Sequence, residues 1–79
     1  MSQREFVESL IKAVVENPGA IEIEEETEGT SRTYFVHADP NDVGKIIGKS
    51  GRVVAAIRTV VSAVASKDKE RAMVKVVTD

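Results

Sequence analysis

A chain of 79 residues without cysteine can form one small domain with one modest core, and it offers no thiol for a disulfide or a thiolate metal site. The sequence has no run of about 18 apolar residues and no signal-peptide pattern at its start, so we expect a single soluble, cytoplasmic domain over residues 1–79 with no membrane contact. The net charge of −2 argues against a uniformly basic nucleic-acid binder, but residues 1–40 carry three basic and nine acidic side chains, whereas residues 41–79 carry eight basic and four acidic ones. The second half is therefore the part suited to a polyanion.

The first segment predicts an amphipathic helix from Ser2 to Asn17. Its apolar residues recur at spacings of three and four, with charged residues between them. Ser2 and Glu5 have the spacing of a capping box, and Asn17 with the following Pro18 predicts the end of the helix.

A β-hairpin is expected next. Isoleucine alternates with glutamate in residues 21–24, as in a half-buried strand, and residues 32–38 predict the second strand, with Tyr34 and Val36 on one face. Residues 24–31 crowd acidic side chains around one glycine. They predict a solvated hairpin tip, with a site for a cation or a basic partner as the alternative.

The second half predicts two helices and a last strand. Asp39 or Asn41 is the expected N-cap of a short helix over residues 42–47. Residues 52–66 predict a longer helix whose valine-rich stripe packs on the core, and residues 72–78 predict the final strand. The side chains expected to point inward are those of Val43, Ile46 and Ile47 from the short helix and of Val53, Val54, Ile57, Val60, Val61 and Val64 from the long one.

Between these helices lies the turn Gly48-Lys49-Ser50-Gly51, which we refer to as the GXXG turn. Two glycines let the backbone approach a ligand closely, and the helix that follows directs its unpaired N–H groups and the positive end of its dipole into the turn. Lys49, Arg52 and the Ser50 hydroxyl add charge and donors. The sequence therefore predicts an anion site, most naturally for phosphate.

No pattern predicts catalysis, a metal site or a cofactor. His37 is the only histidine, and it has no partner for a relay; a position at the rim of a strand is the ordinary explanation, with an RNA contact as the alternative. Gly48-Lys49-Ser50 matches the end of a Walker A motif, but that motif needs a glycine at position 43, where this chain has Val43. We therefore expect a binding protein and not an enzyme.

The run Asp42-Val43-Gly44-Lys45-Ile46-Ile47-Gly48-Lys49-Ser50-Gly51-Arg52, followed by apolar residues at helical spacing, resembles the KH domain and in particular the small bacterial KhpA (YlqC) family. The order of the predicted elements matches the type II KH fold: helix, strand, strand, helix, GXXG turn, helix, strand. We expect an α+β domain with a three-stranded mixed sheet and three helices on one face. The hairpin should supply an antiparallel pair and the strands flanking the motif a parallel pair.

The resemblance implies a cytoplasmic RNA chaperone or post-transcriptional regulator that binds short single-stranded RNA through the GXXG turn and forms a homodimer or a heterodimer with a larger KH-containing protein. Few aromatic residues and a negative net charge predict weak sequence preference. The expected RNA-binding residues are Lys45, Ile47, Gly48, Lys49, Ser50, Gly51 and Arg52, and the candidates for an apolar groove floor are Ile46, Ile47, Val53 and Val54.

Two questions stay open at this point. The chain could be an adaptor that keeps the KH fold and works by pairing with another KH protein, and the acidic first half favours this alternative. The charged segment Lys67–Arg71 could be a solvated loop or an electrostatic flank of the RNA groove.

Overall fold

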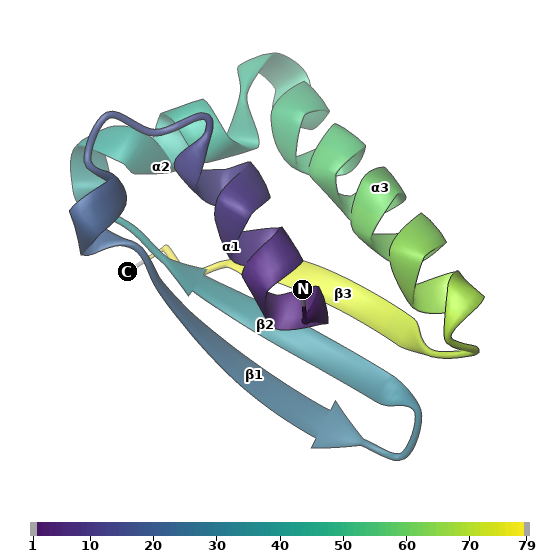
Figure 1. Ribbon diagram of the computed structural model, residues 1–79. Coiled ribbons are helices and arrows are strands. Elements are labelled where there is room, and N and C mark those ends of the chain that lie inside the picture. Colours follow the sequence, from purple (N-terminus) through teal and green to yellow (C-terminus); the bar gives the residue numbers. More distant parts are fainter. Residues whose placement is uncertain (1, 79) are drawn as a thin grey trace.

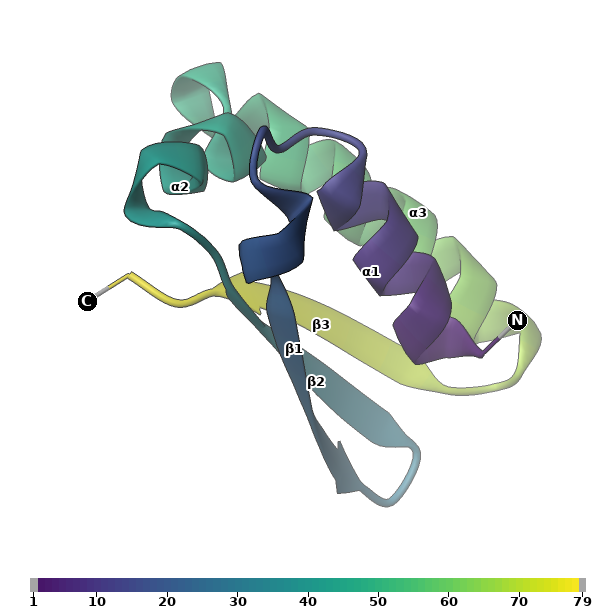
Figure 2. The same ribbon diagram turned by 60° about the vertical axis from the view of Figure 1, so that its left-hand side comes forward.

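The computed structural model describes residues 2–78 and confirms the predicted order of elements (Figure 1). The elements are α1 (Gln3–Lys12), a 3₁₀ turn (Pro18–Ala20), β1 (Glu22–Glu28), β2 (Ser31–His37), α2 (Pro40–Ile47), a second 3₁₀ turn (Lys49–Gly51), α3 (Arg52–Lys67) and β3 (Arg71–Val76). Strand β2 lies in the centre of the sheet, antiparallel to β1 and parallel to β3, as expected. Figure 2 shows the three helices on one side of this sheet. The α+β fold with a three-stranded mixed sheet and three helices on one face is confirmed.

The core lies between the sheet and the helices, and the alternation of side chains along β2 directs its apolar residues there. Tyr34 and Val36 are fully buried, as their shared face predicted. The Tyr34 hydroxyl donates to the Gln3 side-chain oxygen at 2.8 Å, and burial raises the pKa of Tyr34. The buried residues of the main core cluster are Val7, Ile11, Ile21, Ile23, Tyr34, Val36, Ile46, Ile57, Val61 and Val74.

An arginine covers part of each edge of the sheet. The Arg4 guanidinium donates to the carbonyl of Ile23 in β1, and Arg58 donates through Nε to the carbonyl of Val74 in β3 at 2.8 Å. Exposed strand edges present unpaired backbone groups that can pair with other chains. These two contacts satisfy one such carbonyl on each edge.

Helix α1 begins as predicted but ends earlier. Ser2 and Glu5 form the capping box: the Ser2 hydroxyl accepts from the Glu5 N–H, and the Ser2 N–H donates to the Glu5 carboxylate, each at 3.1 Å. The helix stops at Lys12, so its predicted end at Asn17 is wrong. A long-range contact is the reason, because the backbone N–H groups of residues 16 and 17 donate to the buried carboxylate of Asp42.

Two further expectations are wrong in detail. Strand β1 continues to Glu28, so most of the acidic residues belong to a strand and only Gly29 and Thr30 form the hairpin turn. On α3, Val60 is 43% exposed, whereas Ala65 is buried. The helix therefore turns a narrower face to the core than the valine pattern predicted. Within residues 2–78, no helix is long and apolar enough to cross a membrane.

Candidate nucleic-acid interface

The GXXG turn adopts a backbone that depends on its glycines. Gly48, Ser50 and Gly51 have φ angles of +76°, +57° and +73°, in the left-handed region that most L-residues avoid. A Cβ atom on Gly48 would clash with Cγ2 of Val53 and lie 2.7 Å from its Cβ and 2.9 Å from its backbone nitrogen. Nothing lies within 4 Å of a Cβ built on Gly51. Gly48 is thus required for packing and conformation, and Gly51 for conformation alone.

The turn leads directly into α3, whose first turn has no side-chain cap. Part of the expected set of N–H donors is used locally: the Gly48 N–H donates to the Gly44 carbonyl at 2.8 Å, the Gly51 N–H to the Gly48 carbonyl at 3.1 Å, and the Arg52 N–H to the Lys49 carbonyl. The positive end of the α3 dipole still faces the turn, because no carboxylate or hydroxyl of a capping residue neutralises it.

The polar side chains of the turn are free to meet a ligand. Lys49, Ser50 and Arg52 are all exposed, and neither cation forms an ion pair with another residue of the described part of the chain. The structure therefore brings these three predicted site residues together with Gly48 and Gly51 at the start of α3. This arrangement can bind a phosphate by charge and by hydrogen bonds.

Lys45 on α2 is paired with carboxylates of the chain itself. Its ammonium group lies 3.1 Å from the Glu16 carboxylate and 3.6 Å from that of Asp42. The hydrogen bond to Glu16 is the main reason that the pKa of Lys45 is raised. Lys45 thus has carboxylate partners within the chain, in contrast to Lys49 and Arg52, and its contact with RNA stays a prediction.

Asp42 anchors α2, a role that the sequence interpretation missed. Its carboxylate is fully buried and accepts from the Glu16 N–H at 3.2 Å, the Asn17 N–H at 2.9 Å and the Asn17 side-chain amide at 3.0 Å. Burial pushes the pKa of Asp42 up, but these hydrogen bonds and Lys45 outweigh burial and hold the pKa below its usual value. In the sequence, this role could have been recognised because Asp42 is an acidic residue on an otherwise apolar face of the predicted helix.

Of the four apolar residues expected to form a groove floor, two are buried in the core and two are half-buried. Ile46 is fully buried in the core and Val54 is 6% exposed, so neither offers much surface to a ligand. Ile47 and Val53 are half-buried and keep some exposed surface beside the turn. Val43 lines a depression of about 250 Å³ together with Ala38, Pro40 and the two residues that follow β3.

The histidine lies away from this interface. His37 is at the end of β2, its side chain is 37% exposed, and its Nε2 contacts the carboxylate of Glu24 in β1. Among the residues that the structure describes, no group of three or more His, Cys, Asp or Glu side chains could hold a metal ion.

The fold and the glycine turn together define a type II KH domain. The family model described as "KhpA/KhpB, KH domain" matches residues 4–76, and the chain belongs to this family, which is a family of KH domains and not of enzymes.

Curated relatives cover nearly the same length. The RNA-binding protein KhpA of Caldanaerobacter subterraneus subsp. tengcongensis is 42% identical over 73 residues, which are 92% of this chain and 97% of the relative. The proteins of the same name from Clostridium acetobutylicum and Listeria monocytogenes are 35% and 37% identical, and the matches cover 94% and 92% of this chain and 99% and 96% of the relatives. No solved structure gives a significant match.

Proposed function

We propose that this chain, acting as a single KH domain over residues 1–79, binds short single-stranded RNA through the GXXG turn. The observation that carries the proposal is the uncapped start of α3, where a left-handed glycine turn is flanked by the exposed cations Lys49 and Arg52. The names of the curated relatives, which describe RNA-binding proteins, support it.

In this mode the RNA backbone lies against the turn and the bases lie toward the apolar surface beside it. The Lys49 and Arg52 side chains contact phosphate, and the half-buried Ile47 and Val53 contact bases. The chain has only one tyrosine and two phenylalanines, and Tyr34 is fully buried, so base stacking on aromatic rings contributes little. We therefore expect weak sequence preference and salt-sensitive affinity, which suit an RNA chaperone or a post-transcriptional regulator in the cytoplasm.

The test is fluorescence anisotropy with a short labelled single-stranded RNA at low and moderate salt. The native protein is compared with a Lys49→Asp, Ser50→Asp variant, which keeps both glycines and places two carboxylates where phosphate would bind. Aspartate tolerates the left-handed conformation of position 50. The matched control is Ser9→Asp, Lys12→Asp, which makes the same change in net charge on the exposed surface of α1.

We expect the native protein and the α1 control to bind with affinity that falls as salt rises, and the turn variant to lose binding. Circular dichroism and thermal melting check that all three proteins fold. If the turn variant and the control bind alike, the GXXG turn is not the RNA site.

A second candidate function is pairing with another KH protein, either a second copy or a larger KH-containing partner. The observation that favours it is Val60, a large apolar side chain that is 43% exposed on α3. Sedimentation velocity of the native protein and of a Val60→Glu variant tests this candidate. A native dimer that the substitution converts to monomer supports pairing through α3, and a native monomer at all concentrations contradicts self-pairing.

A further inference from the structure

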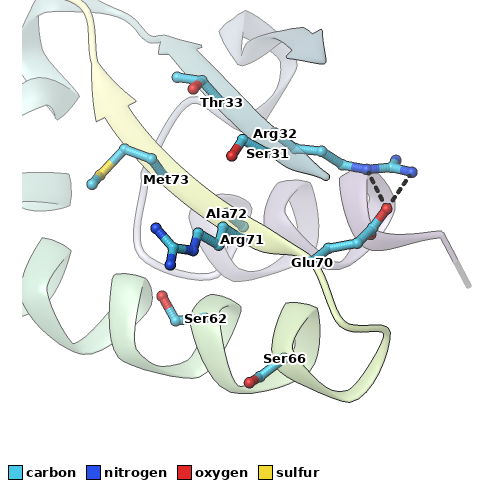
Figure 3. Close-up of a pocket in the computed structure, with 9 residues that line it drawn as sticks. All are labelled: Ser31, Arg32, Thr33, Ser62, Ser66, Glu70, Arg71, Ala72 and Met73. Carbon is cyan, nitrogen blue, oxygen red and sulfur yellow. Dashed lines mark hydrogen bonds and ion pairs between the residues drawn. The ribbon is translucent and has the colours of Figure 1, made fainter. Parts of the chain in front are cut away.

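A groove lies at the other end of α3, away from the GXXG turn. It has a volume of about 500 Å³ and is bounded by the second half of α3 and by the first residues of β2 and β3 (Figure 3). Volumes of about 300–1,000 Å³ are usual for sites that hold small ligands. Its lining includes Ser31, Thr33, Ser62, Ser66, Arg71 and Met73, together with Arg32 and Glu70.

We propose that this groove is a second RNA subsite, which binds the sugar-phosphate backbone of the same single strand that the GXXG turn holds. The inference rests on the proposed function and deepens it, because it extends the RNA-binding surface along α3. Of the charged segment Lys67–Arg71, it is Arg71 that we expect to contact RNA.

The charge of the groove favours an anionic occupant. Glu70 is the acidic residue of the groove, and it is already paired: its Oε2 accepts from Arg32 Nη2 at 3.0 Å and from Arg32 Nε at 3.2 Å. Arg32 also bridges to Glu25 at 3.0 Å, and the hydrogen bond to Glu70 is the main reason that its pKa is raised. Arg71 is exposed, and no ion pair joins it to another residue between 2 and 78. Arg71 is thus the cation that the groove offers to a ligand.

Figure 3 places this cation beside Ser62, in a groove that three further hydroxyl side chains line. Arg71 reaches from β3 toward Ser62 on α3, whereas Arg32 is turned to Glu70. Ser31 and Thr33 contribute hydroxyls from β2, and Ser66 contributes one from the next turn of α3. A guanidinium in a groove lined by short hydroxyl side chains suits phosphate oxygens and ribose hydroxyls, which give affinity without reading sequence.

The groove also offers limited apolar contact. Met73 is 46% exposed and is the largest apolar side chain of the lining. A thioether side chain can pack against the face of a base without selecting its identity. Apart from Ala72, the other lining residues are polar or charged, which favours the polar backbone of a nucleic acid as the occupant.

The distance from the GXXG turn fits a continuing strand. Helix α3 and strand β3 lie side by side in both views (Figures 1 and 2). Ser62 and Ser66 follow Arg52 by 10 and 14 residues, which at 1.5 Å per residue is about 15 and 21 Å along the helix. A GXXG turn holds about four nucleotides, so a longer strand that leaves the turn along α3 reaches this groove.

The test measures binding of two RNAs, one of about four nucleotides, the number that a GXXG turn holds, and one of about ten. Arg71→Glu is compared with Lys12→Glu, which changes the net charge equally on α1, and with the Lys49→Asp, Ser50→Asp variant of the turn. Ser62→Glu is a second groove variant on an exposed helical position, and it keeps the test valid if the change at the start of β3 disturbs the strand.

For both groove variants, we expect affinity for the longer RNA to fall about tenfold at low salt and the slope of log affinity against log salt to decrease by about 1, because one phosphate contact is lost. Affinity for the shorter RNA should not change. The turn variant should lose both RNAs and the α1 control neither.

Groove variants that bind the longer RNA like the native protein would overturn the inference. So would groove variants that leave RNA binding intact but change the sedimentation coefficient, because the groove would then hold a protein. If the turn variant binds both RNAs normally while the groove variants lose the longer one, the proposed function of the turn fails and the groove stands.

Discussion

The starts of α2 and α3 differ in capping: a side chain caps α2, and none caps α3. At α2, the Asp39 carboxylate accepts from the Asn41 N–H at 2.8 Å, and Pro40 in the first turn has no N–H to satisfy. At α3, Gly51 occupies the N-cap position in a left-handed conformation, and no side chain caps the helix. The N-terminus of α2 is therefore capped by a carboxylate of the chain, whereas the N-terminus of α3 has no side-chain cap and can accept an external anion.

This difference explains why two neighbouring helix starts suit different purposes. A helix N-terminus attracts negative charge through its free N–H groups and its dipole. Asp39 supplies that charge at α2, so an external anion gains little there. At α3 the neighbouring side chains are the cations Lys49 and Arg52, which would strengthen the binding of an external anion.

Of the substitutions at and near the two helix starts, those at the turn glycines should change the free energy of unfolding most. Gly48→Ala should destabilise the fold by about 2–4 kcal/mol, because the new Cβ meets Val53 and the backbone is left-handed. Gly51→Ala is the matched control and should cost only about 1 kcal/mol, because the space around it is open. Urea denaturation measures both values. Equal losses would show that Gly48 is not needed for packing against α3.

The next effect concerns Asp42, which holds α2 and therefore the turn. Asp42→Asn should lower the melting temperature at pH 7 by more than about 5 °C, because an amide group would face the N–H donors of Glu16 and Asn17.

The same substitution predicts a change in pH dependence. The pKa of Asp42 is lowered in the folded protein, so its contribution to stability is present above the ordinary value near 4 and is lost as pH falls through the folded pKa. Thermal melts between pH 7 and about pH 2 should show a smaller loss of stability on acidification in Asp42→Asn than in the native protein. Parallel pH profiles would contradict this role for the carboxylate.

Removing the N-cap of α2 should change the free energy of unfolding less. Asp39→Ala removes the cap of α2 and should cost about 1 kcal/mol of stability. Its affinity for short RNA should stay unchanged, because the proposed site is the start of α3. Chemical denaturation and anisotropy measure the two quantities on one sample. A large loss of RNA affinity in a folded Asp39→Ala protein would remove the distinction between the two helix starts.

The smallest effect is expected at Ser50. Ser50 has a left-handed backbone, φ +57° and ψ +26°, which costs a non-glycine residue some stability. Ser50→Gly removes that cost but adds backbone freedom to the unfolded chain, so a net gain of about 0.5 kcal/mol is expected. Urea denaturation checks the sign, and a loss of stability would mean that the Ser50 side chain makes a favourable contact in the turn.

The fold could be predicted because its signals are local. Alternation in residues 21–24 and in β2, helical spacing in α1 and α3, and the two-helix connection between the central and last strands are all visible in the sequence. The end of α1 was not predictable in this way, because the carboxylate that holds Asn17 belongs to Asp42, 25 residues further along the chain.

In the candidate site too, features formed by residues adjacent in sequence could be predicted, and features that depend on distant residues could not. The glycine turn and the helix start at residues 48–52 could be predicted, since they are contiguous in sequence; their role in binding stays a prediction. The ion pair of Lys45 could not be predicted, because its partner Glu16 lies in the connection between α1 and β1. The groove around Arg71 draws on β2, α3 and β3, and its free cation can be recognised only once Arg32 and Glu70 are seen to pair.

An NMR titration of ¹⁵N-labelled protein with a short single-stranded RNA can locate the RNA site residue by residue. We expect the backbone amide signals of residues 49–53, at the uncapped start of α3, to shift as RNA is added, and those of residues 41–43, at the capped start of α2, to stay in place. Shifts at the start of α2 without shifts at the start of α3 would contradict the assignment of the RNA site to the GXXG turn.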